Sequence, residues 1–305
     1  MRVVIFGAGA LGLWFGFMLD NVADVVCISR ERIKNTLKNN TLVLKKGDEL
    51  KSKKLKIETS INSVGKPDFV LLATKSYDSE EALKTIKSKW NSVDIITIQN
   101  GIYTEEVAEK LFGKDKIFPA SVLIGSRFIN ESTIEEFLNE GMKIGSLIEN
   151  NRLDKICNVF ENAGIKIEKS GNIMRDKWHK FMFYCSSATL NALTGILDLS
   201  FEHARWIVRE SLNEIVRVAE YLNLDFSAKE VADDVFGFSQ SFKPKKWKAS
   251  VGEDLRKGRK TEIEYLNGYV VKLAKKFNLE VKVNETLYRV VKMLEFTGLF
   301  KGLTV

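Results

Sequence analysis

Three glycines near the start of the chain have the spacing of a phosphate-binding loop. Gly7, Gly9 and Gly12 form the pattern G-x-G-x-x-G between an apolar run and a helical pattern. The first glycine permits a tight turn, the second lets the backbone approach a pyrophosphate, and the third lets the helix pack closely. The helix N-terminus adds N–H donors and a positive dipole. Glycine-rich turns also occur for structural reasons, but this position after a strand predicts dinucleotide binding. The residues expected to bind the cofactor here are Gly7, Ala8, Gly9, Ala10, Leu11 and Gly12.

The end of the second apolar run, "CISRER", indicates which dinucleotide would be preferred. An NAD site has Asp or Glu at this place for the ribose 2′-hydroxyl. This chain instead has Ser29 and Arg30, with Arg32 close by. Hydroxyl and cationic groups suit a 2′-phosphate, so the sequence predicts NADPH. Glu31 could accept a ribose hydroxyl if it points inward, and a solvated turn is the alternative interpretation of Arg32.

A single lysine interrupts a segment that otherwise indicates a buried helix. Residues 178–195 read "WHKFMFYCSSATLNALTG", apolar or small nearly throughout, with Lys180 near the start. A lysine in this setting either extends its ammonium to water or takes part in chemistry. The surroundings that the rest of the chain builds decide between the two.

The elements that must position these groups alternate between strand and helix in the first half. Apolar runs at 2–6, 24–28, 68–74 and 94–99 predict buried strands, and helical patterns lie at 11–20, 78–90 and 104–112. This order indicates parallel βαβ units, so we expect an α/β Rossmann-like domain with a mostly parallel sheet. Runs at 120–129 and 132–138 predict a later, partly antiparallel portion.

Beyond 163–173 the strand patterns stop and long amphipathic helices follow. Apolar residues at Val208, Leu212, Ile215 and Ala219 are spaced by four, three and four residues, as on one face of a helix. We therefore place a domain boundary near 170, with residues 1–170 forming the α/β domain and residues 171–305 an all-helical domain.

Composition excludes several classes of protein. The chain has 305 residues, 45% hydrophobic and 29% charged, which is a globular balance. No apolar run approaches the roughly 18–20 residues of a membrane span, and no signal peptide is recognisable, so a cytoplasmic protein is expected. Three cysteines without metal-ligand spacing predict neither disulfides nor a metal site. The net charge of +7 suits anionic partners, but no motif indicates nucleic-acid or membrane binding.

Several short stretches together resemble one family. They are "GAGALG" at 7–12, "ATKSYDSEEAL" at 73–83, "QNG" at 99–101, "WHK" at 178–180 and "SVGEDLRKGRKTEIEYLNG" at 250–268. Their order and spacing resemble those of the ketopantoate reductases (2-dehydropantoate 2-reductases). The resemblance implies reduction of a 2-keto acid to a D-2-hydroxy acid with NADPH, in a cleft between a Rossmann domain and a helical substrate domain. It also implies a place in pantothenate and coenzyme A biosynthesis.

The resemblance implies catalytic roles for Lys180 and Glu262. Lys180 matches the family's catalytic lysine, and a lysine is protonated at neutral pH, as a general acid requires. Glu262 matches a glutamate that holds the substrate hydroxyl and the lysine, and it also borders the cofactor. From the residues alone, "TEIE" predicts a capping box with Thr261 at the N-cap and Glu264 at N3, which places Glu262 in a first helical turn.

Three further positions match binding residues of the family. Asn100 matches a residue beside nicotinamide and substrate, Lys75 one that contacts the cofactor, and Ser250 one that binds the substrate carboxylate. Each has a plainer alternative. Asn-Gly is a common turn pair, Lys75 can be a solvated lysine, and "SVGE" predicts that Ser250 is an N-cap.

The chain departs from the family in its substrate-binding helix. The family usually has asparagines four and eight residues after the catalytic lysine, and here these positions are Tyr184 and Ala188. Asn191 follows Lys180 by eleven residues, about three turns of an α-helix, so we expect it on the same face, where it could compensate or cap the helix end.

Three functions therefore stay open. The first is a ketopantoate reductase, and the second is a D-2-hydroxyacid dehydrogenase of the same superfamily that acts on another branched or aromatic 2-keto acid. The third is a non-catalytic NADP-binding regulatory protein, which the presence of Lys180, Glu262, Asn100 and Ser250 disfavours. The sequence leaves the oligomeric state open, and a homodimer is one assembly it allows, because the helical domain could bury a dimer surface.

Overall fold

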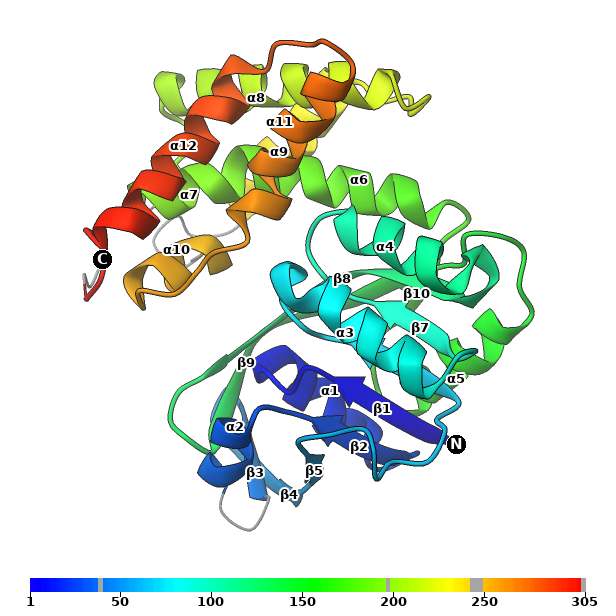
Figure 1. Ribbon diagram of the computed structural model, residues 1–305. Coiled ribbons are helices and arrows are strands. Elements are labelled where there is room, and N and C mark those ends of the chain that lie inside the picture. The colour runs from blue at the N-terminus through cyan, green and yellow to red at the C-terminus, as the bar shows by residue number, and fades with distance from the viewer. Residues whose placement is uncertain (38–40, 196–197, 242–248, 303–305) are drawn as a thin grey trace. The chain divides into compact units, whose positions relative to one another are not determined.

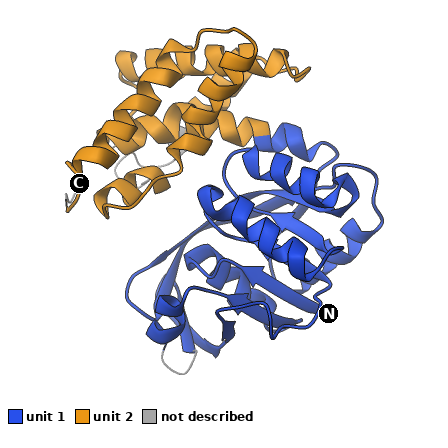
Figure 2. Cartoon of the chain, in the orientation of Figure 1, with its two compact units in different colours: residues 1–177 blue, residues 178–305 orange. Residues whose placement is uncertain are grey.

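The computed structural model describes residues 1–37, 41–195, 198–241 and 249–302. The chain divides into two compact units, Met1–Lys177 and Trp178–Val305 (Figure 2). The sequence placed the domain boundary at 170, and the division between the units lies seven residues later. Helix α6 (Ile173–Phe183) crosses this division.

The described strands of the first unit form one sheet, in the order β4-β3-β9-β8-β7-β6-β1-β2-β5, with β10 paired to β9 (Figure 1). The strands are β1 (Arg2–Phe6), β2 (Asp24–Ile28), β3 (Thr41–Lys46), β4 (Glu49–Lys54), β5 (Lys56–Glu58), β6 (Phe69–Leu72), β7 (Asp94–Thr97), β8 (Ile117–Phe128), β9 (Thr133–Ile144) and β10 (Ile167–Lys169). Neighbours from β8 to β5 pair in parallel, whereas β8 with β9 and β3 with β4 are antiparallel. The predicted α/β fold with a mostly parallel sheet and a later antiparallel portion is confirmed.

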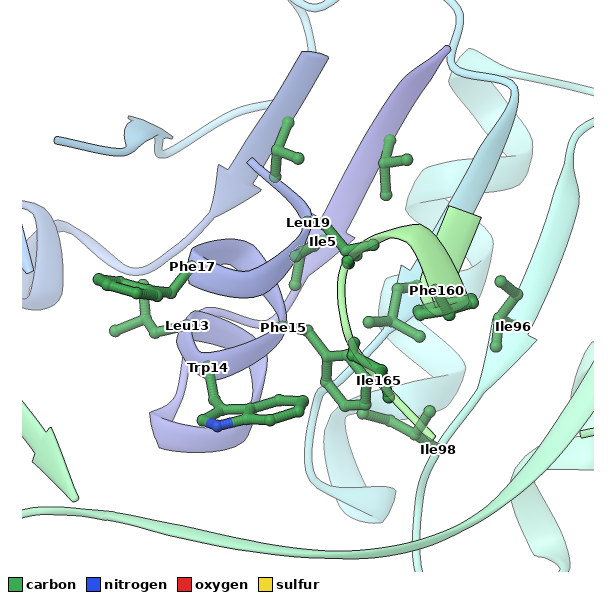
Figure 3. Close-up of a cluster of buried hydrophobic side chains, with 14 of the residues drawn as sticks. Ile5, Leu13, Trp14, Phe15, Phe17, Leu19, Ile96, Ile98, Phe160 and Ile165 are labelled. Atoms are coloured by element: carbon green, nitrogen blue, oxygen red, sulfur yellow. The ribbon is translucent and has the colours of Figure 1, made fainter. Parts of the chain in front are cut away.

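Helices cover both faces of this sheet, because its central strands are apolar on both sides. Along β1, alternate residues belong to two different buried clusters: Val3 and Ile5 to one, Val4 to the other. The first cluster includes α1 (Ala10–Leu19) and α5 (Arg152–Asn162), and the second α3 (Ser76–Lys89) and α4 (Tyr103–Phe112). Figure 3 shows part of the first, where the ring centroids of Phe15 and Phe160 lie 6.0 Å apart. The short α2 (Glu31–Thr36) follows β2.

The second unit is helical in all its described regular elements, as predicted. After α6 come the π-helix η3 (Tyr184–Ala188), α7 (Thr189–Thr194), α8 (Glu202–Glu220), α9 (Ala228–Ser241), α10 (Ser250–Arg256), the 3₁₀ turn η4 (Ile263–Tyr265), α11 (Asn267–Lys276) and α12 (Lys282–Thr297). Helix α8 packs on α9, and α11 packs on α12. None of the helices in the described ranges is long and apolar enough to span a membrane.

The π-helix η3 corrects one expectation. Its i→i+5 hydrogen bonding interrupts the α-helix between Lys180 and Asn191. The placement of Asn191 on the Lys180 face assumed 3.6 residues per turn throughout. That assumption fails at η3, so the eleven-residue spacing no longer puts the two side chains on one face.

Candidate active site

The glycine loop joins β1 to α1 and has room for a ligand at one of its three glycines. Gly7 has φ +110°, and a Cβ built on it would lie 2.5 Å from the Thr74 backbone nitrogen. A Cβ on Gly12 would lie 2.2 Å from the Gly7 carbonyl oxygen, whereas a Cβ on Gly9 would meet no protein atom within 4 Å. Packing within the protein therefore requires glycine at two positions and leaves open space at Gly9, beside the first turn of α1, where a phosphate fits.

The donors of this loop are not all available to an anion. The N–H of Ala8 donates to the Ile28 carbonyl oxygen (2.9 Å), and that of Gly9 to the Gly7 carbonyl oxygen (2.9 Å). The N–H groups of Ala10 and Leu11 belong to the first turn of α1, where helical N–H groups have no partner within the helix. A pyrophosphate at this loop would therefore bind to the start of α1.

Ser29 and Arg30 lie directly after β2, where the sequence placed them. The Arg30 side chain is 81% exposed, and its Nη2 lies 2.7 Å from Asp78 Oδ2 of α3. The Ser29 hydroxyl donates to the Arg30 carbonyl oxygen (3.2 Å). Asp78 is a carboxylate that the sequence reasoning did not consider, and it would compete with a 2′-phosphate for Arg30.

Lys75 and Asn100 lie in neighbouring loops at the carboxyl edge of the sheet. Lys75 is the N-cap residue of α3 after β6, and Asn100 follows β7, which pairs with β6 in parallel. The Ser76 hydroxyl joins the loops by donating to the Asn100 carbonyl oxygen (3.3 Å). Because β1 pairs with the other side of β6, the glycine loop lies at the same edge. This is where an open α/β sheet places its ligands.

A buried ion pair supports the Asn100 loop and was missed by the sequence reasoning. Lys177 Nζ lies 2.6 Å from Glu105 Oε1, and each of the two side chains is 3% exposed. The same ammonium donates to the Gln99 carbonyl oxygen (3.0 Å), and the Thr97 hydroxyl donates to Glu105 Oε1 (2.6 Å). A cation, a carboxylate and two polar residues of one strand end therefore form a single buried network.

A signal for this pair is present in the helical spacing. Lys177 follows Ile173 by four residues and precedes Phe181 by four, and both neighbours are buried. Glu105 precedes Ala108 by three and Phe112 by seven, again on the buried side of its helix. A charged residue on an apolar stripe at each of two helices would have indicated a buried pair.

In the second unit, Lys180 and Tyr184 face each other. Lys180 Nζ lies 5.3 Å from the centroid of the Tyr184 ring, within range of a cation–π contact. Both residues are half-buried, whereas Ala188 and Asn191 are 0% and 1% exposed. The phenol that replaces the family's asparagine is thus in contact with the candidate acid.

Asn191 connects to the start of α10. Its Oδ1 accepts a hydrogen bond from the Ala249 N–H (2.8 Å), so the amide fixes the residue directly before Ser250. Ala249 is the N-cap residue and Ser250 is the first residue of the helix, so the predicted N-cap role of Ser250 is wrong by one position. Ala249 has an extended backbone and Ser250 is already helical, so α10 begins at Ser250.

The capping box predicted around Glu262 is also wrong. Residues Ile263–Tyr265 form a 3₁₀ turn that starts after Glu262, not an α-helix with Glu262 in its first turn. The Thr261 N–H and hydroxyl both donate to Glu295 Oε1 of α12 (2.7 and 2.6 Å), and Glu264 Oε2 accepts from the Tyr288 hydroxyl (2.7 Å). Long-range partners therefore take both donors of Thr261 and occupy Glu264, although Thr261 Oγ1 still accepts from the Ile263 N–H (3.2 Å). Glu262 is 6% exposed.

Amide side chains hold the π-helix η3 from behind. Asn267 Nδ2 donates to the Cys185 carbonyl oxygen (2.9 Å), and Asn267 Oδ1 accepts from the Thr189 hydroxyl (2.8 Å). Asn267 also donates to Asn284 Oδ1 (3.0 Å), which extends the network to α12. Among the described residues, no group of three or more His, Cys, Asp or Glu side chains could hold a metal ion.

Two family models match the chain. The model of "Ketopantoate reductase PanE/ApbA" matches residues 3–149, and that of its C-terminal domain matches residues 172–295. The chain belongs to the ketopantoate reductase family. This is a family of oxidoreductases, so the resemblance read from the five sequence stretches is confirmed.

Individual relatives agree with the family over nearly the whole length. A 2-dehydropantoate 2-reductase of Pyrococcus horikoshii is 27% identical and aligns with 98% of this chain and 99% of its own. A PanE/ApbA family ketopantoate reductase from Ralstonia eutropha has the same fold, with a TM-score of 0.88 at 22% identity over 98% of this chain and 100% of its own. A D-mandelate dehydrogenase, solved with NADH and anilino(oxo)acetate, also has a TM-score of 0.88, at 21% identity over 99% of this chain and 100% of its own.

Proposed function

We propose that this chain reduces 2-dehydropantoate to D-pantoate with NADPH, in the cytoplasm, as a step of pantothenate and coenzyme A biosynthesis. The observation that carries the proposal is the Lys180 ammonium, half-buried and held against the Tyr184 ring in a chain of this family. The fit of a dinucleotide rests on the open space at Gly9 and the start of α1.

Each candidate residue has a proposed task in this reaction. The nicotinamide, when bound, supplies the hydride to the C2 ketone. Lys180 stabilises the negative charge that develops on the keto oxygen and donates the proton that completes the hydroxyl. Glu262 holds the substrate hydroxyl and the lysine, Asn100 orients the reacting groups, and Ser250 binds the substrate carboxylate. Asn191 acts on Ser250 through the Ala249 N–H.

The test of the acid is Lys180→Ala beside His179→Ala. His179 is the neighbouring residue, and its Nε2 lies 2.9 Å from Asp234 Oδ2, so it serves as a matched control. We expect Lys180→Ala to lower kcat by about 10²–10⁴ while NADPH still binds, because a general acid contributes that much. The loss of NADPH absorbance with 2-dehydropantoate measures the rate. An unchanged kcat in Lys180→Ala would refute the role of Lys180.

The cofactor preference rests on Arg30. We propose that it binds the 2′-phosphate of NADPH despite its contact with Asp78. Arg30→Ala should raise KM for NADPH and leave KM for NADH unchanged, and Arg32→Ala is the control. A wild-type enzyme with equal kcat/KM for NADH and NADPH would contradict this preference.

A second substrate class is favoured by the aromatic groups around Lys180. The rings of Phe183 and Tyr184 lie 6.0 Å apart, and Phe183 also contacts Phe238 of α9 at 4.8 Å. Such a wall suits a branched or aromatic 2-keto acid that lacks the hydroxyl of 2-dehydropantoate. A higher kcat/KM for phenylpyruvate than for 2-dehydropantoate would select this alternative, and Tyr184→Asn should then shift the ratio back towards 2-dehydropantoate.

We also propose a homodimer. The last helix, α12, and the turn after it expose Val290, Met293, Phe296 and Leu299 at intervals of three residues, and Phe296 is 93% exposed. Large apolar side chains exposed together on α12 and the turn after it indicate a protein contact. Sedimentation analysis of the wild type and Phe296→Ser should show a dimer that the substitution weakens, and a wild-type monomer would contradict the proposal.

A further inference from the structure

Burying the charges of Lys177 and Glu105 costs desolvation free energy, and the attraction between the two charges does not clearly offset this cost. Both side chains are 3% exposed, and two ionic groups lose their hydration when they are buried to this degree. Replacement of such a pair by apolar residues is often neutral or stabilising. The pair is therefore weak evidence for stability, and its contacts indicate another role.

Those contacts converge on the backbone just before Asn100. Lys177 Nζ donates to the Gln99 carbonyl oxygen (3.0 Å), which belongs to the peptide bond between Gln99 and Asn100. The Gln99 side chain donates to the carbonyl oxygens of Leu72 (2.9 Å) and Thr74 (3.2 Å), so it ties the loop to the end of β6. Gly101, the residue after Asn100, has φ +89°, a conformation that favours glycine and turns the chain directly after Asn100.

Buried polar atoms in the network and beside it lack hydrogen-bond partners. Among the described residues, Gln99 Oε1, Thr104 Oγ1 and Glu105 Oε2 are buried without a hydrogen-bond partner. An unpaired buried polar atom is costly, and a core selected for stability alone would not accumulate them around one ion pair. Imperfect satisfaction of this kind is typical of residues retained for function.

We propose that Lys177 and Glu105 are a positioning pair for Asn100. The inference rests on the proposed function, in which Asn100 orients the reacting groups. Glu105 keeps the Lys177 ammonium buried, the ammonium fixes the Gln99 carbonyl, and the fixed peptide bond sets the direction of the Asn100 side chain. Neither member of the pair touches substrate or cofactor in this role.

The decisive variant removes both charges. Lys177→Met and Glu105→Leu each leave an unpaired buried charge and should lower the unfolding temperature. The double variant leaves none and should regain most of that loss. Its kcat with 2-dehydropantoate or phenylpyruvate should nevertheless stay about tenfold to hundredfold below wild type, because a small misplacement of a positioning residue costs that much. A double variant that regains kcat together with stability would overturn the proposal.

Two further readouts separate positioning from general damage. The Kd for NADPH should change little in the double variant, because the glycine loop is untouched. Lys116→Met is the matched control: Lys116 Nζ lies 3.8 Å from Asp94 Oδ1, at the opposite end of β7. This control should retain the wild-type kcat.

Hydrogen exchange tests whether the pair fixes the Asn100 loop, even if the proposed function is wrong. The amide protons of Asn100 and Gly101 should exchange faster in the double variant and at the wild-type rate in Lys116→Met. Unchanged exchange in the double variant would overturn the positioning role. A wild-type protein that turns over neither keto acid would instead contradict the proposed function, and the exchange result would still stand on its own.

Discussion

The two units each bury a carboxylate, but they satisfy it in different ways. In the first unit Glu105 is paired with the ammonium of Lys177 at 2.6 Å. In the second unit Glu214 of α8 accepts hydrogen bonds from the backbone N–H groups of Val283 and Asn284 (both 2.9 Å), at the start of α12. Glu214 also accepts from Asn284 Nδ2 (2.8 Å). One carboxylate is held by a cation and the other by a helix N-terminus.

The difference determines what each network can support. A helix N-terminus spreads its positive potential over several N–H groups, and no single substitution removes it. From Glu214 the second network continues through Asn284 and Asn267 to the carbonyl of Cys185 in η3, so it holds a whole helical turn. The ion pair holds one carbonyl, that of Gln99, and it depends on both of its members. The cationic arrangement is more local and more fragile.

The largest expected effect tests that fragility. Glu105→Gln keeps the shape of the side chain but leaves the Lys177 charge buried without its counter-charge. We expect the free energy of unfolding to fall by about 3–5 kcal/mol, measured by urea denaturation. Glu106→Gln, at the adjacent exposed position, is the control and should change stability by about 0.5 kcal/mol or less. A loss as small as that of the control would show that the ion pair contributes no more to stability than an exposed carboxylate does.

A smaller loss is expected at the helix-bound carboxylate. Glu214→Gln removes the charge and converts one acceptor oxygen into a donor that faces the N–H groups of α12. Because the dipole and the remaining oxygen still contribute, we expect a loss of about 1–3 kcal/mol in the same urea assay. If Glu214→Gln proves as destabilising as Glu105→Gln, the distinction between the two networks disappears.

The sequence predicted the strands, helices and loops better than the hydrogen bonds and ion pairs that hold them. The short apolar runs of β1, β2, β6 and β7 alternate with helical patterns, so these strands and their parallel pairing followed from pattern alone, whereas the order of the strands in the sheet did not. The glycine loop and the loops of Lys75 and Asn100 followed in turn, because they sit at strand ends. The helical half followed from its amphipathic spacing.

The errors arose where distant residues determine local structure. The box at Thr261 fails because Glu295, thirty-four residues later, takes both donors of Thr261. The π-helix η3 leaves no mark on the apolar spacing, and the amide that holds its Cys185 carbonyl comes from Asn267, eighty-two residues away. Lys177 and Glu105 could each have been found from a position on an apolar stripe, but the contact between them could not be placed at the Gln99 carbonyl, because periodicity assigns a face and not a contact.

The support of η3 gives the third prediction. The Thr189 hydroxyl lies 2.8 Å from Asn267 Oδ1 and 3.2 Å from the Tyr184 carbonyl oxygen. Thr189→Val keeps the volume and removes this donor, so unfolding should become easier by about 1 kcal/mol. Thr189→Ser keeps the hydroxyl and removes only the methyl group, so it should be nearly as stable as wild type. If Thr189→Ser is instead as unstable as Thr189→Val, packing of the methyl group and not the hydrogen bond stabilises η3. Urea denaturation of the three proteins separates the two contributions.

The smallest effect depends on pH and concerns a partly buried carboxylate. Burial alone would raise the pKa of Glu295 above its ordinary value of 4.5, but hydrogen bonds from Lys292 and Thr261 outweigh it and lower the pKa. A carboxyl group with a lowered pKa in the folded state stabilises the protein above its unfolded-state pKa, and this contribution is lost as pH falls through the folded-state pKa.

At pH 7, Glu295→Gln should therefore lower the free energy of unfolding by about 1 kcal/mol or less, because solvent screens the pair with Lys292. The difference between wild type and variant should shrink as the pH is lowered below 4.5. A difference that stays constant from neutral to acidic pH would mean that Glu295 holds Thr261 by shape and hydrogen bonding alone, which would make it resemble the neutral amides of Asn267 more than the charge of Glu105.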